Sequence, residues 1–322
     1  MKKLSLRTFI QNLYSLWVYD FHSWDTSLSG KIDYIEKNIA KKEKWDRIVS
    51  LLENYKGELS DSREMAFVRA LQIPQFVVFP YHQIKRLETF EVGYDNVLKL
   101  LYVIHDKKRL YYNRAFTIDS CERSYRFLIE QDQILEGGYL EKAPHCYQTE
   151  SFKVEEGDVL IDGGAAEGLF ALDVIDKVSH VYLIEADSNW IPALKATFAP
   201  YKDKVTIINK YLSDCDDTDN ISLGSILARH NGNCFVKMDI EGAEPKVIKG
   251  ALSYLNTRDN VKLSCCTYHY QNDAKELADL FESIGYQHEF SAGWFFFAEY
   301  DMPEPPYLRH ALIRAKNESF FF

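Results

Sequence analysis

The second half of the chain, from about residue 152 onward, alternates short apolar runs with segments of helical periodicity. The apolar runs are expected to form strands at 159–162, 180–185, 205–210, 234–239 and 261–267. The helical segments between them fall at about 168–176, 190–198, 223–230, 245–254 and 273–284. Strands that alternate with helices build a mostly parallel sheet with helices on its faces. Later strands at 286–290, 294–300 and 309–315 are expected to include an antiparallel edge pair, so the pattern predicts an α/β fold.

The first 145 residues or so carry a different pattern, which predicts a mainly helical extension. Helical spacing runs through 4–24 and 31–55. An aspartate followed three positions later by a glutamate predicts two further helix starts, at Asp61 and Asp119. Two runs at 99–105 and 109–113 flank Asp106-Lys107-Lys108 and predict a small β-hairpin.

The two halves are expected to be separate domains. Gly137 and Gly138 break the helical pattern, and the stretch that follows has no period and contains Pro144. We place the boundary near residue 145, which gives an N-terminal region of 1–145 and an α/β domain of 146–322. A length of 322 residues fits two domains, and 46% apolar residues suffice for a core in both. The first region is expected to cap a site on the second domain or to form a homodimer surface.

The composition argues against several classes of partner. The formal charge of −10 disfavours a nucleic acid partner, because proteins that bind a phosphate backbone concentrate Lys and Arg. No apolar run reaches the length of a membrane span, and polar residues interrupt the first run too early for a secretory signal. The cysteines form no C-x-x-C pair and are expected to be reduced thiols of a cytoplasmic protein; they are Cys121, Cys146, Cys215, Cys234, Cys265 and Cys266.

A glycine-rich loop follows the first predicted strand of the α/β half. Asp162 ends that strand, and Gly163, Gly164 and Gly168 lead into the next helix, so the backbone can pass close to a ligand. Glu185 ends the second strand, 185 − 162 = 23 residues after Asp162. A carboxylate about 20 residues beyond such a loop accepts hydrogen bonds from ribose hydroxyls. The loop and Glu185 together predict a cofactor that contains a ribose.

Two classes of cofactor fit this loop. Gly163-x-Ala165-x-x-Gly168 approximates the dinucleotide fingerprint, which would make the cofactor NAD. The acidic side chains of Asp162 and Glu167 would repel a pyrophosphate, and they suit a cationic sulfonium instead. A glycine turn that binds nothing is the third alternative.

A second motif, Lys237-Met238-Asp239-Ile240-Glu241-Gly242-Ala243-Glu244, ends the fourth strand. An open parallel sheet has its ligand crevice at that end of the strands. Asp239, Glu241 and Glu244 are expected to hold the cofactor amine, to bond acceptor hydroxyls, or to bind Mg²⁺ through Asp239 and Glu241. Glu244 alternatively only complements the start of a helix. Lys237 either neutralises these carboxylates or acts chemically.

These motifs resemble the FkbM family of S-adenosylmethionine-dependent methyltransferases, over about residues 147–317. The resemblance rests on the glycine loop from Asp162 to Gly168, on Glu185-Ala186-Asp187 and on the motif from Lys237 to Glu244. It implies the class I, Rossmann-like methyltransferase fold with a seven-stranded sheet, and S-adenosylmethionine as the cofactor. It further implies which residues contact each part of the cofactor. The methionine end would lie against Asp162, Gly163, Gly164, Ala165 and Gly168, the ribose against Glu185 and Ala186, and the adenine against Ser213 and Asp214.

Two residues depart from the family pattern. Ala166 stands where the family often has Asn, which the loop should tolerate because it works through its backbone. Gly224 stands where the family usually has Asp, and this weakens an active-site role for the start of that helix.

His269 follows the fifth strand and is expected to face the same crevice. A neutral imidazole can take a proton from a hydroxyl at physiological pH, so His269, Asp239 and Glu241 are the predicted catalytic residues. A histidine between Tyr268 and Tyr270 is alternatively a packed loop residue.

The sequence thus predicts an O-methyltransferase that acts on a hydroxyl of a small molecule or glycan. The rivals are an NAD-dependent oxidoreductase and a non-catalytic binding protein of the same fold, for which Gly224 is the best support. The acceptor itself is not encoded in any motif, because a fold and a cofactor site narrow the reaction and not the substrate.

Overall fold

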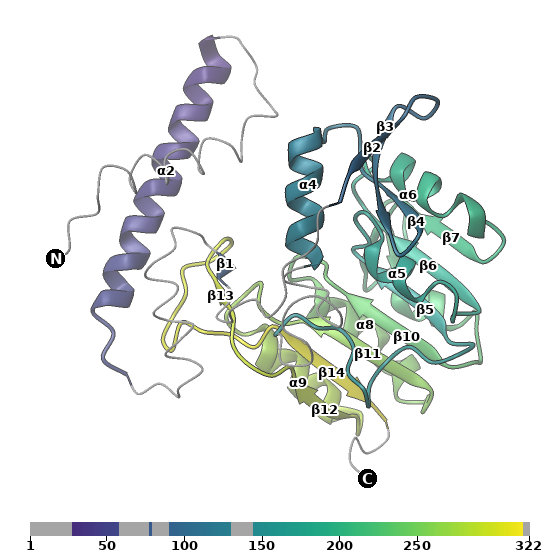
Figure 1. Cartoon of the computed structure of the whole chain (residues 1–322). Helices are drawn as coiled ribbons and strands as arrows, with labels where there is room; N and C mark the ends of the chain where they lie inside the picture. The colour runs from purple at the N-terminus through teal and green to yellow at the C-terminus, as the bar shows by residue number, and fades with distance from the viewer. Residues whose placement is uncertain (1–27, 58–76, 79–89, 130–143, 318–322) are drawn as a thin grey trace.

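The computed structural model of the chain describes residues 28–57, 77–78, 90–129 and 144–317 (Figure 1). The helices predicted at 4–24 and from Asp61, and the break at Gly137-Gly138, lie outside the described residues. The described part consists of a large α/β unit, a small antiparallel sheet beside it and a long helix, α2 (Leu28–Glu53), near the N-terminus. No described helix combines the length and the apolar character needed to cross a lipid bilayer.

The α/β unit is built on a central sheet with seven described strands. In chain order they are β5 (Val159–Gly163), β6 (His180–Ile184), β7 (Val205–Ile208), β10 (Cys234–Met238), β11 (Val261–Cys266), β12 (Gln287–Phe290) and β14 (Leu312–Lys316). Their order across the sheet is β12-β14-β11-β10-β5-β6-β7, and only β14 runs antiparallel to its neighbours. The seven-stranded, mostly parallel sheet expected from the sequence is confirmed.

The three later strands predicted from the sequence have different outcomes. Two of them, β12 and β14, pair antiparallel at one edge of the central sheet, so the expected antiparallel edge pair is confirmed. The run at 294–300 forms only the short strand β13 (Phe296–Phe297), which pairs antiparallel with β1 (Val77–Val78) outside the central sheet. Hydrophobicity alone does not distinguish β13 from the strands of the central sheet, because β13 is as apolar as they are.

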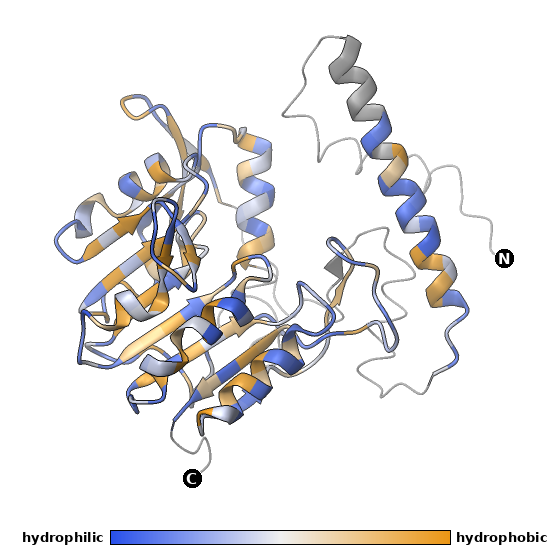
Figure 2. Ribbon diagram, turned by 180° about the vertical axis from the view of Figure 1, so that it is seen from behind, coloured by the Kyte–Doolittle hydropathy of each residue, from blue (hydrophilic) through white to orange (hydrophobic). Residues whose placement is uncertain are grey.

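Helices cover both faces of the sheet, and each strand divides its side chains between two cores. The helices that cover the sheet are α5 (Leu169–Val174), α6 (Ile191–Thr197), α7 (Leu223–Leu227), α8 (Glu244–Leu255) and α9 (Asp273–Ser283). The connections also contain a 3₁₀ turn, η3 (Ala199–Tyr201), and a short parallel pair of strands, β8 (Tyr211–Ser213) and β9 (Asn220–Ser222). Ile161 packs in the cluster with α7, α8 and α9, whereas the preceding Leu160 packs in the cluster with α5 and α6. This alternation follows from the two-residue period of a strand, and the strands are predominantly hydrophobic in Figure 2.

The predicted hairpin is present and gains a third strand. β3 (Leu100–His105) and β4 (Lys108–Tyr111) pair across the turn, and β2 (Val92–Asp95) pairs with the other edge of β3. Helix α4 (Ile118–Phe127) follows, but its N-cap is Thr117 with Ser120 in a capping box, not Asp119. The hydroxyls of Thr117 and Ser120 accept from each other's backbone N–H groups, so Asp119 lies in the first turn of the helix as a favourable charge.

The N-terminal elements share hydrophobic clusters with the α/β unit. Val103 of β3 and Tyr125 of α4 pack in one cluster with Leu172 of α5. Ile48 and Leu52 of α2 are buried in a cluster with apolar residues of 296–308, the segment that connects β12 to β14. The division into domains at residue 145 stays a prediction.

Candidate functional site

The glycine loop joins the ends of three strands. Gly164 has φ +69° and its N–H donates to the carbonyl of Ile184, at the end of β6. A Cβ built on Gly164 would lie 1.9 Å from the carbonyl oxygen of Asp239, just after β10. Gly164 therefore lies close to the chain's own backbone, and the predicted close approach to a ligand stays a prediction. Gly168, with φ +84°, then starts α5.

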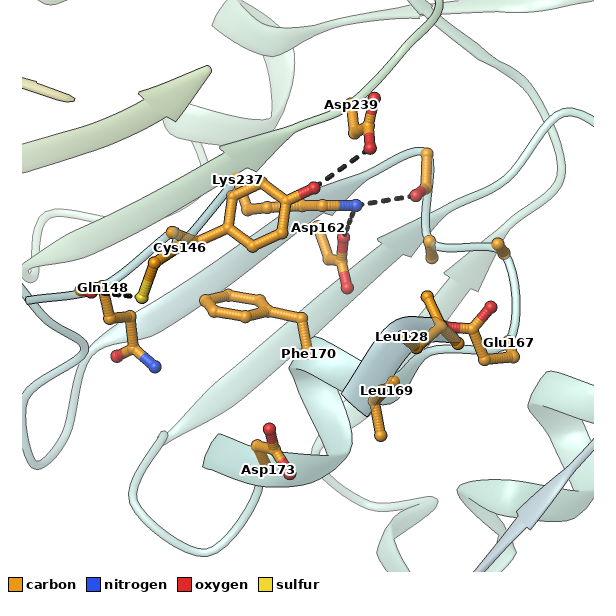
Figure 3. A pocket seen from close by; sticks show the side chains of 14 residues that line it. Leu128, Cys146, Gln148, Asp162, Glu167, Leu169, Phe170, Asp173, Lys237 and Asp239 are labelled. Carbon is orange, nitrogen blue, oxygen red and sulfur yellow. Dashed lines mark hydrogen bonds and ion pairs between the residues drawn. The ribbon is translucent and has the colours of Figure 1, made fainter. Parts of the chain in front are cut away.

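A buried ion pair lies under this loop. Asp162 at the end of β5 is 1% exposed, and its Oδ1 is 3.1 Å from Nζ of Lys237. Lys237 Nζ also donates to the carbonyl of Gly164 over 2.8 Å (Figure 3). Burial works to lower the pKa of Lys237, but the charges of Asp162 and Asp239 outweigh it and raise that pKa. Of the two roles expected for Lys237, the structure thus favours neutralisation of the carboxylates.

Asp239 lies at the carboxyl end of β10 and receives hydrogen bonds on both oxygens. Tyr147 Oη donates to Oδ2 over 3.0 Å, and Tyr268 Oη donates to Oδ1 over 3.2 Å. Burial works to raise the pKa of Asp239, but the hydrogen bond and charge of His269 and the charges of His145 and Lys237 lower it well below its usual range. Asp239 is therefore a fixed anion, with its side chain 24% exposed.

His269 is almost fully buried between carboxylates. Its Nε2 lies 3.4 Å from Asp239 Oδ1 and 3.5 Å from Glu241 Oε2, and its Nδ1 lies 3.6 Å from Glu244 Oε1. Burial works to lower the pKa of His269, but the hydrogen bond to Asp239 and the charges of the three carboxylates raise it to about 9. The imidazole consequently carries a proton at neutral pH, so it must lose that proton before it can serve as the base. The catalytic role of His269 stays a prediction.

The two glutamates of the second motif differ in exposure. Glu241 has φ +60° and a side chain that is 70% exposed, and its carboxylate accepts a hydrogen bond from Tyr300. Glu244 is fully buried at the start of α8, where its Oε1 accepts from the N–H of Ile240 over 2.8 Å. Burial raises the pKa of Glu244 to about 7. Glu244 does lie in the first turn of α8, as the simpler interpretation expects, but it is buried there.

The residues expected at the ribose and adenine are occupied by contacts within the chain. Glu185 Oε2 accepts from the N–H of Ala166 over 2.8 Å, and its Oε1 accepts from the N–H of Asp187 over 2.7 Å. Ser213 Oγ donates to Asp214, which forms an ion pair with Lys246 at 3.2 Å. Asn209 Nδ2 donates to the carbonyl of Ala186 over 3.0 Å. The cofactor roles of Glu185, Ala186, Ser213 and Asp214 stay predictions.

Gly224 has a packing reason in this structure. A Cβ on Gly224 would lie 2.5 Å from the ring of Tyr254, so the absence of a side chain lets α7 pack closely against α8. This departure from the family pattern therefore has a structural explanation that does not depend on catalysis.

A cavity of about 130 Å³ lies against the glycine loop and the end of β10 (Figure 3). Two sets of residues line it: those that the motifs predict, Asp162, Gly164, Ala165 and Asp239, and those that sequence reasoning missed, among them Leu128, Tyr147, Gln148 and Phe170. The missed residues come from α4, from the segment before β5 and from α5. The volume is below the roughly 300–1,000 Å³ of a typical ligand pocket, so this cavity has room for only part of a large ligand.

The comparisons with known proteins return structures of methyltransferases. No family model matches the chain, and no curated protein matches it. The methyltransferase FkbM from Methylobacillus flagellatus KT is 22% identical, with TM-score 0.39, over 51% of this chain and 44% of that chain. The precorrin-6y C5,15-methyltransferase from Geobacter metallireducens GS-15 is 13% identical, with TM-score 0.35, over 52% of this chain and 83% of that one.

An rRNA methylase from Streptococcus thermophilus is 9% identical, with TM-score 0.32, over 52% of this chain and 90% of that one. The match thus spans less than half the length of the FkbM methyltransferase structure. With identities below 25% and TM-scores below 0.5, these likenesses carry no conclusion about the reaction or the acceptor of this chain.

Proposed function

We propose that this protein is an S-adenosylmethionine-dependent methyltransferase that binds the methionine end of the cofactor in the cavity beside the glycine loop. The observation that carries the proposal is the anion Asp239, held at the cavity by two tyrosine hydroxyls and bordered by the loop. Strand order reverses between β5 and β10, which is where an open α/β sheet binds its ligand. A cationic ammonium or sulfonium fits a carboxylate there, whereas a pyrophosphate would be repelled.

The residues around the cavity fit such a cofactor. Lys237 neutralises Asp162, and His269 is shared between Asp239, Glu241 and Glu244, so this group of carboxylates supplies the net negative charge that would receive the cofactor amine. When bound, the cofactor supplies a methyl group already activated by the sulfonium. The contribution of the protein is alignment of the acceptor and exclusion of water, which Phe170 and Tyr147 support as aromatic walls of the cavity.

For the acceptor we propose a hydroxyl of a small molecule or glycan. Near Asp239, the exposed groups Glu241 and Tyr300 offer polar atoms, and their hydrogen bond orients them. Tyr270 and Tyr300 are 44% and 43% exposed, with ring centroids 5.9 Å apart. Aromatic faces beside a carboxylate suit a polyol, because the rings pack on its C–H groups while the carboxylate accepts from its hydroxyls.

Calorimetric titration with S-adenosylhomocysteine tests the cofactor assignment. We expect the native chain to bind it, and Asp239→Asn to weaken binding by about 10- to 100-fold, the cost of about 1.5–3 kcal/mol for a lost hydrogen bond to a charged group. Asp217→Asn is the matched control, because Asp217 caps a turn between β8 and β9. No heat with the native chain, or equal affinities for the two variants, would contradict the proposal.

A further inference from the structure

We propose that His145, Asp239 and Cys266 form a mononuclear site for a divalent metal ion of the zinc type, at the wall of the same cavity. The three side chains come from different parts of the chain: the segment before β5, the end of β10 and the end of β11. Sequence reasoning suggested a magnesium site of Asp239 and Glu241 instead. Within the described ranges, Glu241 belongs to neither of the two groups of three side chains whose ligand atoms converge.

The distances match a tetrahedral metal site. His145 Nε2 lies 3.5 Å from Cys266 Sγ and 3.8 Å from Asp239 Oδ2, and the three ligand atoms lie within 4.8 Å of one another. With zinc–nitrogen and zinc–oxygen bonds of about 2.1 Å and a zinc–sulfur bond of about 2.3 Å, tetrahedral angles place ligand atoms roughly 3.4–3.6 Å apart. The two distances from His145 Nε2 therefore lie close to those of a tetrahedral site.

The second group is Asp239, Glu244 and His269, and its shortest contacts use both ring nitrogens of one imidazole. His269 lies nearest to Asp239 through Nε2 and nearest to Glu244 through Nδ1. A mononuclear ion takes one nitrogen from an imidazole, so it could not lie on both of these contacts. His145, in contrast, offers the same Nε2 to both partners.

The surroundings hold the three ligands in place. His145 is 3% exposed and Cys266 is 0% exposed. The His145 ring packs against Tyr147, with centroids 5.1 Å apart, and against Tyr268, at 5.4 Å. The hydroxyls of the same two tyrosines hydrogen-bond to Asp239, and such contacts behind the ligands are what orients them in metal sites.

The ligand types select the kind of ion. A thiolate and an imidazole favour zinc and related transition metals, whereas Mg²⁺ requires oxygen ligands. Three protein ligands leave one tetrahedral position for water or a substrate oxygen, as in catalytic zinc sites. Asp239 and the two residues that follow His145 line the cavity, so the site borders the space where we place the methyl donor.

Metal analysis and cobalt substitution test this inference without any methyl donor, so the outcome is independent of the proposed reaction. We expect the full chain, purified from zinc-supplemented medium, to retain about one equivalent of zinc. After zinc removal, Co²⁺ should restore one equivalent and give the thiolate-to-cobalt charge-transfer absorption of a Cys-ligated site. Absence of stoichiometric zinc together with absence of that absorption in the native chain would overturn the proposal.

Two variants of neighbouring cysteines localise the site. Cys266→Ala should remove the charge-transfer absorption and weaken zinc binding by at least about 100-fold, the upper end of what loss of a supporting residue costs. Cys265→Ala is the matched control, because Cys265 is equally buried but packs in the core on the opposite face of β11. Should Cys266→Ala fail to fold, Asp239→Asn serves instead, because it keeps the shape and should weaken zinc binding. An unchanged cobalt spectrum in a folded Cys266→Ala would refute the assignment.

Discussion

Replacing Gly164 with alanine tests whether the glycine loop is fitted to the end of β10. Two costs are expected in Gly164→Ala. The first is the left-handed conformation, because φ is +69° and an L-residue there costs about 1–2 kcal/mol. The second is steric, because the new Cβ would lie 1.9 Å from the Asp239 carbonyl oxygen, so the two must separate by 3.0 − 1.9 = 1.1 Å before the contact is tolerable. Such overpacking costs about 1–3 kcal/mol.

Gly157→Ala separates the two costs. Gly157 has φ +83°, so it shares the conformational cost, but a Cβ there meets nothing within 4 Å in the described structure. We expect urea unfolding to show a loss of about 1–2 kcal/mol for Gly157→Ala and of about 2–5 kcal/mol for Gly164→Ala.

The same pair of variants connects the loop to the cofactor. The shift in Gly164→Ala displaces Asp239, so S-adenosylhomocysteine should bind about 10- to 100-fold more weakly, whereas Gly157→Ala should bind as the native chain does. Equal stability and equal affinity in both variants would show that the contact between Gly164 and Asp239 does not position the carboxylate, and the reasoning would fail.

Three further predictions follow from the buried charges. Lys237→Met should destabilise the chain by about 3–5 kcal/mol in urea unfolding, because it leaves Asp162 buried without a partner, and adding Asp162→Asn should restore much of that loss. His269→Ala should lower methyl transfer while S-adenosylhomocysteine affinity in calorimetry stays nearly unchanged; equal turnover would remove it from the mechanism. Burial and the charge of His230 lower the pKa of His180 below 6.5, so its stabilisation is present above pH 6.5 and lost as pH falls through the lowered value. The urea midpoint should therefore fall on acidification, and His180→Gln should reduce that fall.

The parallel strands of the central sheet were predictable because most of them are buried runs with clear boundaries. All five were predicted within two residues at either end. β5, β6, β10 and β11 have side chains buried on both faces, which gives a continuous apolar signal, whereas the edge strand β7 is only half-buried. The run at 294–300 does contain a strand, β13, but its pairing outside the central sheet was not predictable, because apolar character does not say which partner a strand finds. The N-cap of α4 was misplaced because Thr117 and Asp119 are both good caps and only the local backbone decides between them.

The candidate site was predictable only where its residues follow strands. Asp162 lies at the end of β5, and Asp239 comes directly after β10. Parallel neighbouring strands bring these ends to one edge of the sheet. Tyr147 and His145 belong to a segment with no period, and their position beside Asp239 depends on how that segment crosses the sheet. No local pattern encodes such a crossing.

Asp239 explains why these separate segments meet. A carboxylate at the end of a buried strand is costly unless it is bonded, and the described structure supplies Tyr147 from one side and Tyr268 from the other. Those two bonds fix the carboxylate without neutralising it, because hydroxyls donate without carrying charge, and the protonated His269 is shared between Asp239, Glu241 and Glu244. An anion that is rigid and still charged can attract a cationic methyl donor or complete a metal site with His145 and Cys266. Its two oxygens point to different neighbours, because Oδ2 faces His145 and Oδ1 faces His269, so a metal ion held by His145 and Cys266 would take Oδ2.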